Sequence, residues 1–311
     1  MGSGKGFGKT ILFGEHFVVY GYPSIASALG SYTTADVKII EGSGWVVDDQ
    51  RPETPGYKKE KFIEAQQSIK NVIEYLKIDT NSQKLKITFA GDLIAASGVG
   101  ASAAQCTSLA RALNDCFNLE LDNEGINEVA FIGETAYHGT PSGIDNTAST
   151  YGGLIWFVKN LSGGKNTMDL LKSPIKIPLI IANSGITAST NEVVTEVRRL
   201  KDENPEKFKN IFNEYESIAI KAKTALLEGN IKTVGNLMNQ NHKLLQEITV
   251  SGEINDFLVN LALANGAFGA KVTGTGRGGL VIALTKNEKI QNKVANKIKK
   301  EGYDVWKTMI G

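Results

Sequence analysis

Residues 97–104 read SGVGASAA, a glycine-rich loop that leads directly into a predicted helix of small residues over 102–117. Glycines let the backbone curl so that several N–H groups face one point, and the helix N-terminus adds the positive end of its dipole. The pattern is typical of a phosphate site, in which Ser102 could offer its hydroxyl to a metal ion or a phosphate oxygen. The alternative interpretation of the same loop is an N-capped helix after a glycine turn.

Two acids follow this loop along the chain. Glu134 lies in a predicted helix over 124–137, and Asp145 lies in GTPSGIDN at 139–146, where a proline and two glycines predict a rigid turn. One carboxylate could hold Mg²⁺ while the other takes a proton from an attacking hydroxyl, and phosphoryl transfer needs both roles. Either acid alone could instead be a solvated or loop-stabilising carboxylate. His138 is predicted to form a hydrogen bond at the helix end, because no second histidine at suitable spacing supports a zinc site.

Two further glycine elements lie near the ends of the chain. GSGKGFGKT at 2–10 is not a P-loop, because Ser3 stands where the first glycine belongs and no strand precedes it. Residues 1–5 are therefore predicted to be a flexible leader. KVTGTGRGG at 271–279 predicts a strand and a glycine turn, in which Arg277 could contact an anion. A plain connection between two strands is the alternative.

The periodicity of the chain predicts helices packed on one face of a small antiparallel sheet, which is an α+β architecture. A glycine- and asparagine-rich segment at 160–167 predicts a boundary between two domains, 1–165 and 166–311. In the first domain we expect strands at 10–13, 17–20, 33–40, 85–89 and 153–158, an irregular segment at 45–57, and helices at 58–76, 102–117 and 124–137. In the second domain we expect helices at 191–201, 206–228, 231–249, 253–264 and 288–300, and strands at 269–273, 280–284 and 304–309.

The composition excludes several classes of partner. Lys and Arg number 34 against 33 for Asp and Glu, so a net charge of +1 provides no field for nucleic acid or an anionic membrane. No apolar run reaches the roughly 18 residues that a membrane span needs. Cys106 and Cys116 would lie about 15 Å apart in one helix, too far for a disulfide, which predicts reduced core thiols. We therefore expect a cytoplasmic protein with a small-molecule substrate.

Taken together, KTILFGEHFVVYG at 9–21, SGVGASAA and KVTGTGRGG resemble, in this order, the three motifs of the GHMP kinases. The resemblance covers roughly residues 8–308. Four segments are more specific: GEHFVVYG at 14–21, VDDQRPETPGY at 47–57, HGTPSGIDN at 138–146 and GITASTNEVV at 185–194. They resemble the mevalonate-phosphorylating branch in the compact form known from kinetoplastid protozoa.

The resemblance implies a ribosomal S5 domain 2-like N-terminal domain and a ferredoxin-like C-terminal domain, with the active site in the cleft between them. It also implies ATP as co-substrate, Mg²⁺ as cofactor, phosphorylation of the primary hydroxyl of (R)-mevalonate to 5-phosphomevalonate in isoprenoid biosynthesis, and a homodimer.

The resemblance further assigns roles to matching positions. Asp145 would be the catalytic base or would orient the mevalonate hydroxyl, with Lys9 beside it, and Ser102 and Glu134 would hold Mg²⁺. The residues expected to cradle the nucleotide phosphates, here called the phosphate loop, are Gly98, Val99, Gly100, Ala101, Ser102 and Ala103. The residues expected to contact mevalonate are Lys9, Glu15, His16, Asp145, Thr190, Gly276 and Arg277.

Two positions depart from the family pattern. Ala101 stands where the family often has a serine, which removes one possible hydroxyl contact, and Arg277 replaces a glycine common in animal members. Within the family, the alternatives are a kinase for homoserine, galactose or phosphomevalonate, or the related ATP-dependent decarboxylase. Outside catalysis, the alternative is a sensor that binds ATP and a metabolite without turnover. An S5-like fold suggests RNA binding by analogy only.

Overall fold

The computed structural model describes residues 1–96, 98–186 and 188–311. Ser97 of the predicted glycine loop and Thr187 of the GITASTNEVV segment lie outside the described residues. Contacts divide the chain into two units. The first consists of Met1–Lys9 and Ala28–Gly152, and the second of Thr10–Ser27 and Gly153–Gly311. Each is described by itself.

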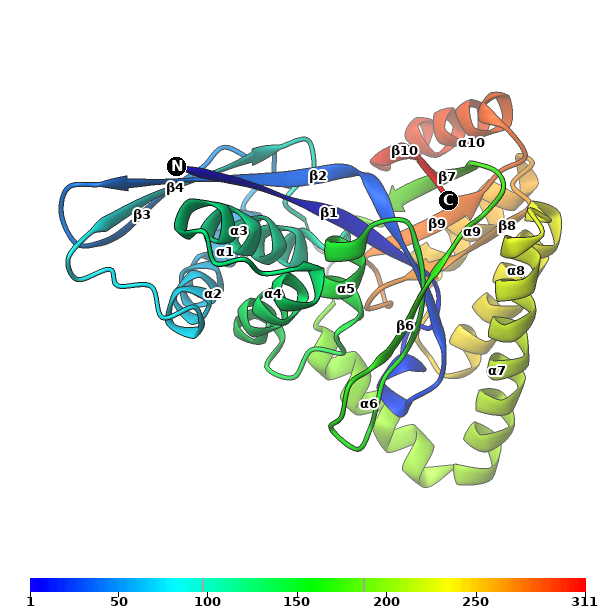
Figure 1. Ribbon diagram of the computed structural model, residues 1–311. Coiled ribbons are helices and arrows are strands. Elements are labelled where there is room, and N and C mark those ends of the chain that lie inside the picture. Colours follow the sequence, from blue (N-terminus) through cyan, green and yellow to red (C-terminus); the bar gives the residue numbers. More distant parts are fainter. Residues whose placement is uncertain (97, 187) are drawn as a thin grey trace. The chain divides into compact units, whose positions relative to one another are not determined.

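The first unit is a sheet covered by helices (Figure 1). Strand β4 pairs in parallel with β3 and antiparallel with β2, and β1 also pairs with β2. Apolar side chains of β2 and β4 form one core with those of α2, α3 and α4, so the helices bury the apolar face of the sheet. The elements are β1 (Gly2–Phe13), β2 (Ser24–Ile40), β3 (Gly44–Asp49), β4 (Lys84–Gly91), α1 (Tyr57–Glu60), α2 (Phe62–Tyr75), α3 (Ala101–Phe117), α4 (Asn123–His138) and α5 (Ile144–Tyr151).

The second unit contains an antiparallel sheet in the order β10-β7-β9-β8. Helices α9 and α10 share an apolar core with β7, β8 and β9. Strand β5 pairs with β6 and with residues 24–27 of β2. The elements are the 3₁₀ helix η1 (Val18–Tyr20), β5 (Leu154–Val158), β6 (Thr167–Leu171), β7 (Ile177–Asn183), α6 (Thr190–Glu203), α7 (Pro205–Leu227), α8 (Ile231–Glu247), α9 (Glu253–Ala264), β8 (Gly269–Thr273), β9 (Leu280–Leu284), α10 (Glu288–Lys300) and β10 (Val305–Ile310).

The expected α+β class is confirmed, and all five predicted helices of the second half form. The division into units differs from the predicted one at residue 165, because the loop after β5 joins it to β6 inside the second unit. Cys106 and Cys116 are free thiols of α3, the first buried and the second only partly. None of the helices in the described part of the chain combines the length and the apolar composition that a membrane span requires.

The flexible leader predicted at residues 1–5 is wrong, because four of these residues, from Gly2 to Lys5, belong to β1. A Cβ atom at Gly2, Gly4 or Gly6 would collide with backbone carbonyl oxygens of α3. The alternating glycines therefore let the strand lie directly against the helix, which is a packing role for glycine within a strand.

Three other local predictions are also wrong. The strand predicted at 17–20 is the helix η1, where Phe17 stacks on Tyr215 of α7 with ring centroids 3.7 Å apart. The segment expected to be irregular contains β3, which gains its backbone partners from β4. Asp145 lies in the first turn of α5 rather than on a rigid turn. Strands β6 and β7 were not predicted.

Candidate active site

Lys9 and Asp145 form an ion pair in the first unit. Lys9 is buried in β1, and its Nζ lies 3.0 Å from Asp145 Oδ2. The backbone N–H of Lys9 donates to Val99 O at 2.8 Å, which fastens this strand to the phosphate loop. Gly100 adopts a φ of +71°, and a Cβ there would lie 2.6 Å from Lys9 Cγ. The predicted convergence of the ammonium, the carboxylate and the glycine turn is therefore confirmed.

The phosphate loop has the expected form where it is described. Gly98 and Gly100 have positive φ, and α3 begins at Ala101, one residue before the predicted start. Among the residues described, no side chain caps this helix. The N–H groups of its first turn are therefore available to an anion, and Ser102 lies within that turn.

Glu134 of α4 is fully buried beside this pair. Its pKa is raised to about 8, first by burial and then by the Asp145 carboxylate, whereas a hydrogen bond from Ser102 and the charge of Lys9 act in the opposite direction. Within the described part of the chain, Glu134 Oε2 has no hydrogen-bond partner, and His138 Nε2 lies 3.8 Å from it. A buried carboxylate oxygen without a donor is the kind of atom that a cation would stabilise.

The donor set fits Mg²⁺ better than a metal held by protein alone. Mg²⁺ commonly takes one or two carboxylates and completes its shell with water and substrate phosphates. Among the described residues, no three His, Cys, Asp or Glu side chains gather as metal ligands. Ser102 and Glu134 thus suit an ion that is also held by a nucleotide.

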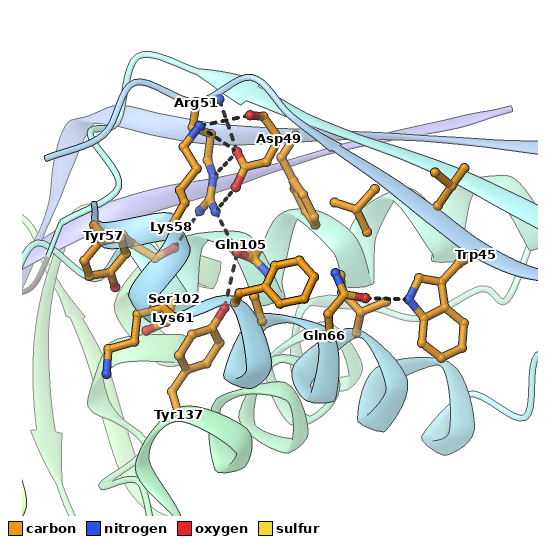
Figure 2. Close-up of a pocket in the computed structure, with 17 residues that line it drawn as sticks. Trp45, Asp49, Arg51, Tyr57, Lys58, Lys61, Gln66, Ser102, Gln105 and Tyr137 are labelled. Carbon is orange, nitrogen blue, oxygen red and sulfur yellow. Dashed lines mark hydrogen bonds and ion pairs between the residues drawn. The ribbon is translucent and has the colours of Figure 1, made fainter. Parts of the chain in front are cut away.

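A pocket of about 360 Å³ adjoins the first turn of α3 (Figure 2). Its apolar surface comes from strands β3 and β4 and from helices α1 and α2, and it includes Trp45, Val47, Tyr57, Phe62, Ile69 and Phe89. Ala101, Ser102, Gln105 and Tyr137 complete it from the side of α3 and α4. A concave site of this size with a few polar groups suits a small organic ligand.

The polar end of this pocket is a hydrogen-bonded network around Arg51. Its Nε and Nη2 donate to the two Asp49 carboxylate oxygens at 2.9 and 2.6 Å, and Nη2 also donates to Gln105 Oε1 at 2.8 Å. Tyr137 donates to the same Gln105 oxygen at 3.3 Å. Although burial raises it, the pKa of Asp49 lies below its usual value because of Arg51. No role was predicted for Asp49, Arg51, Gln105 or Tyr137. Asp49 and Arg51 lie in the VDDQRPETPGY segment, but their network with Gln105 and Tyr137 joins separate elements of the chain.

The other predicted substrate residues lie in the second unit. Glu15 pairs with Lys271 of β8, their Oε1 and Nζ atoms 2.5 Å apart and both side chains fully buried. His16 Nε2 lies 2.8 Å from Thr275 O, and burial is the main cause that lowers its pKa to about 4. The hydroxyls of Thr190 and Thr275 are 2.7 Å apart. This unit therefore gathers Glu15, His16 and Thr190 around β8 and its glycine turn.

Gly276 and Arg277 of that turn are fastened to the segment after α8. A Cβ at Gly276 would collide with Val250 O, and the Arg277 N–H donates to the same oxygen at 2.7 Å. The Arg277 guanidinium donates to Thr249 O at 2.8 Å and to Thr249 Oγ1 at 2.7 Å. Two of its nitrogens are thus engaged within the chain. The predicted anion contact by Arg277 stays a prediction.

Two family models match the chain. The model described as the GHMP kinases N terminal domain matches residues 67–153, and the one described as GHMP kinases C terminal matches residues 222–304. A mevalonate kinase of Thermococcus sibiricus is 31% identical over 313 residues, covering 94% of this chain and 91% of that protein.

Solved structures match over the whole chain. The L. major mevalonate kinase in complex with R-mevalonate has a TM-score of 0.94 and 38% identity, covering 100% of this chain and 96% of that one. The Methanococcus jannaschii mevalonate kinase has a TM-score of 0.81 and 25% identity, covering 99% and 98%.

Proposed function

Because the chain belongs to the mevalonate kinases of the GHMP kinase family, we propose that it phosphorylates the primary hydroxyl of (R)-mevalonate with ATP, using Lys9 and Asp145 at that hydroxyl. The product is 5-phosphomevalonate, an intermediate of isoprenoid biosynthesis. The 3.0 Å ion pair beside the phosphate loop is the observation that carries this proposal. The expected kinetoplastid-like form is confirmed by the likeness to the L. major enzyme.

Asp145 accepts a hydrogen bond from the mevalonate hydroxyl and takes its proton during transfer, while Lys9 stabilises the negative charge that develops on the oxygen. The ion pair fixes both side chains, since Lys9 is held by a buried strand and Asp145 by the first turn of α5. Positioning and charge stabilisation supply most of the catalysis in phosphoryl transfer. This rigid pair therefore suits the reaction.

The N–H groups of the phosphate loop hold the nucleotide phosphates, assisted by the dipole of α3. Ser102 and Glu134 hold Mg²⁺, which when bound neutralises charge on those phosphates. Glu134 Oε2 supports this assignment, because it is buried and has no hydrogen-bond partner among the described residues. The pocket next to Ser102 takes the base of the nucleotide, because its apolar surface can cover an aromatic ring and Arg51 fixes the residues at its polar end.

Glu15, His16, Thr190, Gly276 and Arg277 contact the mevalonate chain under this proposal. In support, Glu15, His16 and Thr190 are attached to β8 and its glycine turn through Lys271 and Thr275, and Gly276 and Arg277 belong to that turn. This shared position supports a common ligand for the five residues.

A panel of alcohols tests the proposed function. ADP release would be measured with ATP, Mg²⁺ and either mevalonate, phosphomevalonate, homoserine or galactose, and ATP binding would be measured in parallel. We expect kcat/KM to be highest for mevalonate. A higher value for another alcohol would refute the substrate, and tight ATP binding without turnover of any alcohol would indicate a sensor.

The homodimer and the cytoplasmic location stay predictions from the family resemblance. Light scattering of the purified protein tests the first, since it gives the mass of the assembly directly. Fractionation of the source cells tests the second.

A further inference from the structure

Lys271 is a buried ammonium group to which no part of the proposed reaction has assigned a role. It lies in β8, a strand whose five residues are all buried, and its side chain has no exposed surface. Its Nζ contacts Glu15 Oε1 at 2.5 Å and donates to Val272 O at 2.7 Å. Burial lowers the pKa of Lys271, against the raising effect of Glu15. A charge in such a place is unfavourable unless its partner is well placed.

Strand β8 and the turn after it also contact the chain on both sides of Glu15. Thr273 Oγ1 donates to Ile11 O at 2.9 Å and accepts from Ile11 N at 3.3 Å. On the other side, His16 contacts Thr275 O, with a φ of +62° that is strained for a histidine. The turn that carries Glu15 is thus held by three contacts, which involve Lys271, Thr273 and Thr275. Among the described residues, Lys271 is the only one of these three that contacts the Glu15 side chain.

The second Glu15 oxygen is the feature that points to a ligand. Within the described residues, Oε2 is buried and has no hydrogen-bond partner, although Oε1 is fully engaged by Lys271. An unpaired carboxylate oxygen in a buried place is unfavourable until a donor reaches it. His16 Nδ1, on the adjacent residue, is likewise buried and without a partner among the residues described.

We infer that Lys271 is a positioning residue, whose ammonium group holds Glu15 in one orientation so that Oε2 accepts a hydrogen bond from a hydroxyl of the alcohol substrate. This inference rests on the proposed function. The substrate group is a hydroxyl rather than a carboxylate, because a second carboxylate against Oε2 would be repelled. Lys271 itself does not touch the substrate, since its ammonium group contacts Glu15 and Val272 O.

Four variants separate this role from a purely structural one. Lys271→Met removes the charge at similar length, Glu15→Gln removes the acceptor charge, and the double variant replaces the ion pair by a neutral pair. Lys297→Met, on the exposed side of α10, is the matched control. Each protein would be characterised by its thermal midpoint, its KM for mevalonate and its KM for ATP.

We expect Lys271→Met to lower the thermal midpoint and to raise KM for mevalonate at least about tenfold, the effect of losing a hydrogen bond to a charged group, with KM for ATP nearly unchanged. The double variant should recover the thermal midpoint but keep the high KM for mevalonate. Recovery of both quantities would overturn the inference, because Lys271 would then serve stability alone. Should Lys271→Met fail to fold, the same quantities would be compared between Glu15→Gln, the double variant and the wild type. A raised KM for mevalonate in both variants would then support the inference, and an unchanged KM would refute it.

An assay of the wild type separates failure of the proposed function from failure of the role inferred for Lys271. If the wild type does not turn over mevalonate, the proposed function fails and this inference fails with it. If the wild type is active and the folded variants retain its KM for mevalonate, the proposed function stands and this inference alone is refuted.

Discussion

Replacing Glu134 by Gln should make the first unit of the metal-free protein less sensitive to pH. Glu134 is fully buried, and its pKa is raised from 4.5 in the unfolded chain to about 8 in the folded protein, mainly by burial and by Asp145. Between these values the folded state binds more protons than the unfolded state, so stability falls as pH rises. The contribution of Glu134 is complete below pH 4.5 and is lost as pH rises through about 8.

The size of this effect follows from proton linkage. For a carboxyl group with these two pKa values, the free energy of unfolding falls by about 2 kcal/mol between pH 6 and pH 8. The substituted glutamine side chain carries no titrating proton, so that pH-dependent loss of stability should disappear from the variant. Saturating Mg²⁺ and ATP should also remove this pH-dependent loss of stability from the wild type, because a cation beside Glu134 stabilises the ionised form of the carboxyl group.

Hydrogen exchange of the α4 backbone amides measures the free energy of opening of this part of the chain, rather than that of the whole protein. Wild type and Glu134→Gln would be compared at both pH values with a chelator present. Glu128→Gln, an exposed position of the same helix, is the matched control and should behave as the wild type. An equal loss of protection in the wild type and in Glu134→Gln would refute the reasoning.

Three shorter predictions concern other parts of the site. Asp145→Asn should lower kcat by about 10²–10⁴-fold with ATP affinity nearly unchanged, measured by kinetics and calorimetry, and an unchanged kcat would contradict its role. Gly100→Ala should lower the free energy of unfolding by roughly 1–3 kcal/mol, because the residue has positive φ and its Cβ would meet Lys9; a denaturation curve matching the wild type would argue against that close contact. Arg51→Met should raise KM for ATP about tenfold and leave KM for mevalonate unchanged, because Asp49 and Gln105 lose the guanidinium group that joins them. Equal changes in both constants would speak against a base pocket.

Features with a local signal were predicted well. Helical periodicity located α3 and α4 to within about one residue at each end, because an amphipathic helix repeats within a few turns. The pairing of Lys9 with Asp145 was also predicted, although it joins distant positions, because the surrounding motifs are specific to one family.

Features that depend on distant partners were not predicted. The glycines at the start of β1 have low strand propensity, and only the approach of α3 explains why they form a strand. The apolar run after His16 becomes a helical turn because Phe17 stacks on Tyr215, a partner that no local pattern reveals. The network around Arg51 likewise depends on elements that meet only in the folded chain.

The inclusion of Thr10–Ser27 in the second unit has a consequence for synthesis on the ribosome. Glu15 leaves the ribosome 256 residues before its partner Lys271, and at cellular rates of translation this interval is roughly 10–50 s. Until α7 and then β8 emerge, the segment with Phe17 and Glu15 lacks its native contacts to them. The nascent chain therefore carries this short apolar segment without its native packing until β8 has been made.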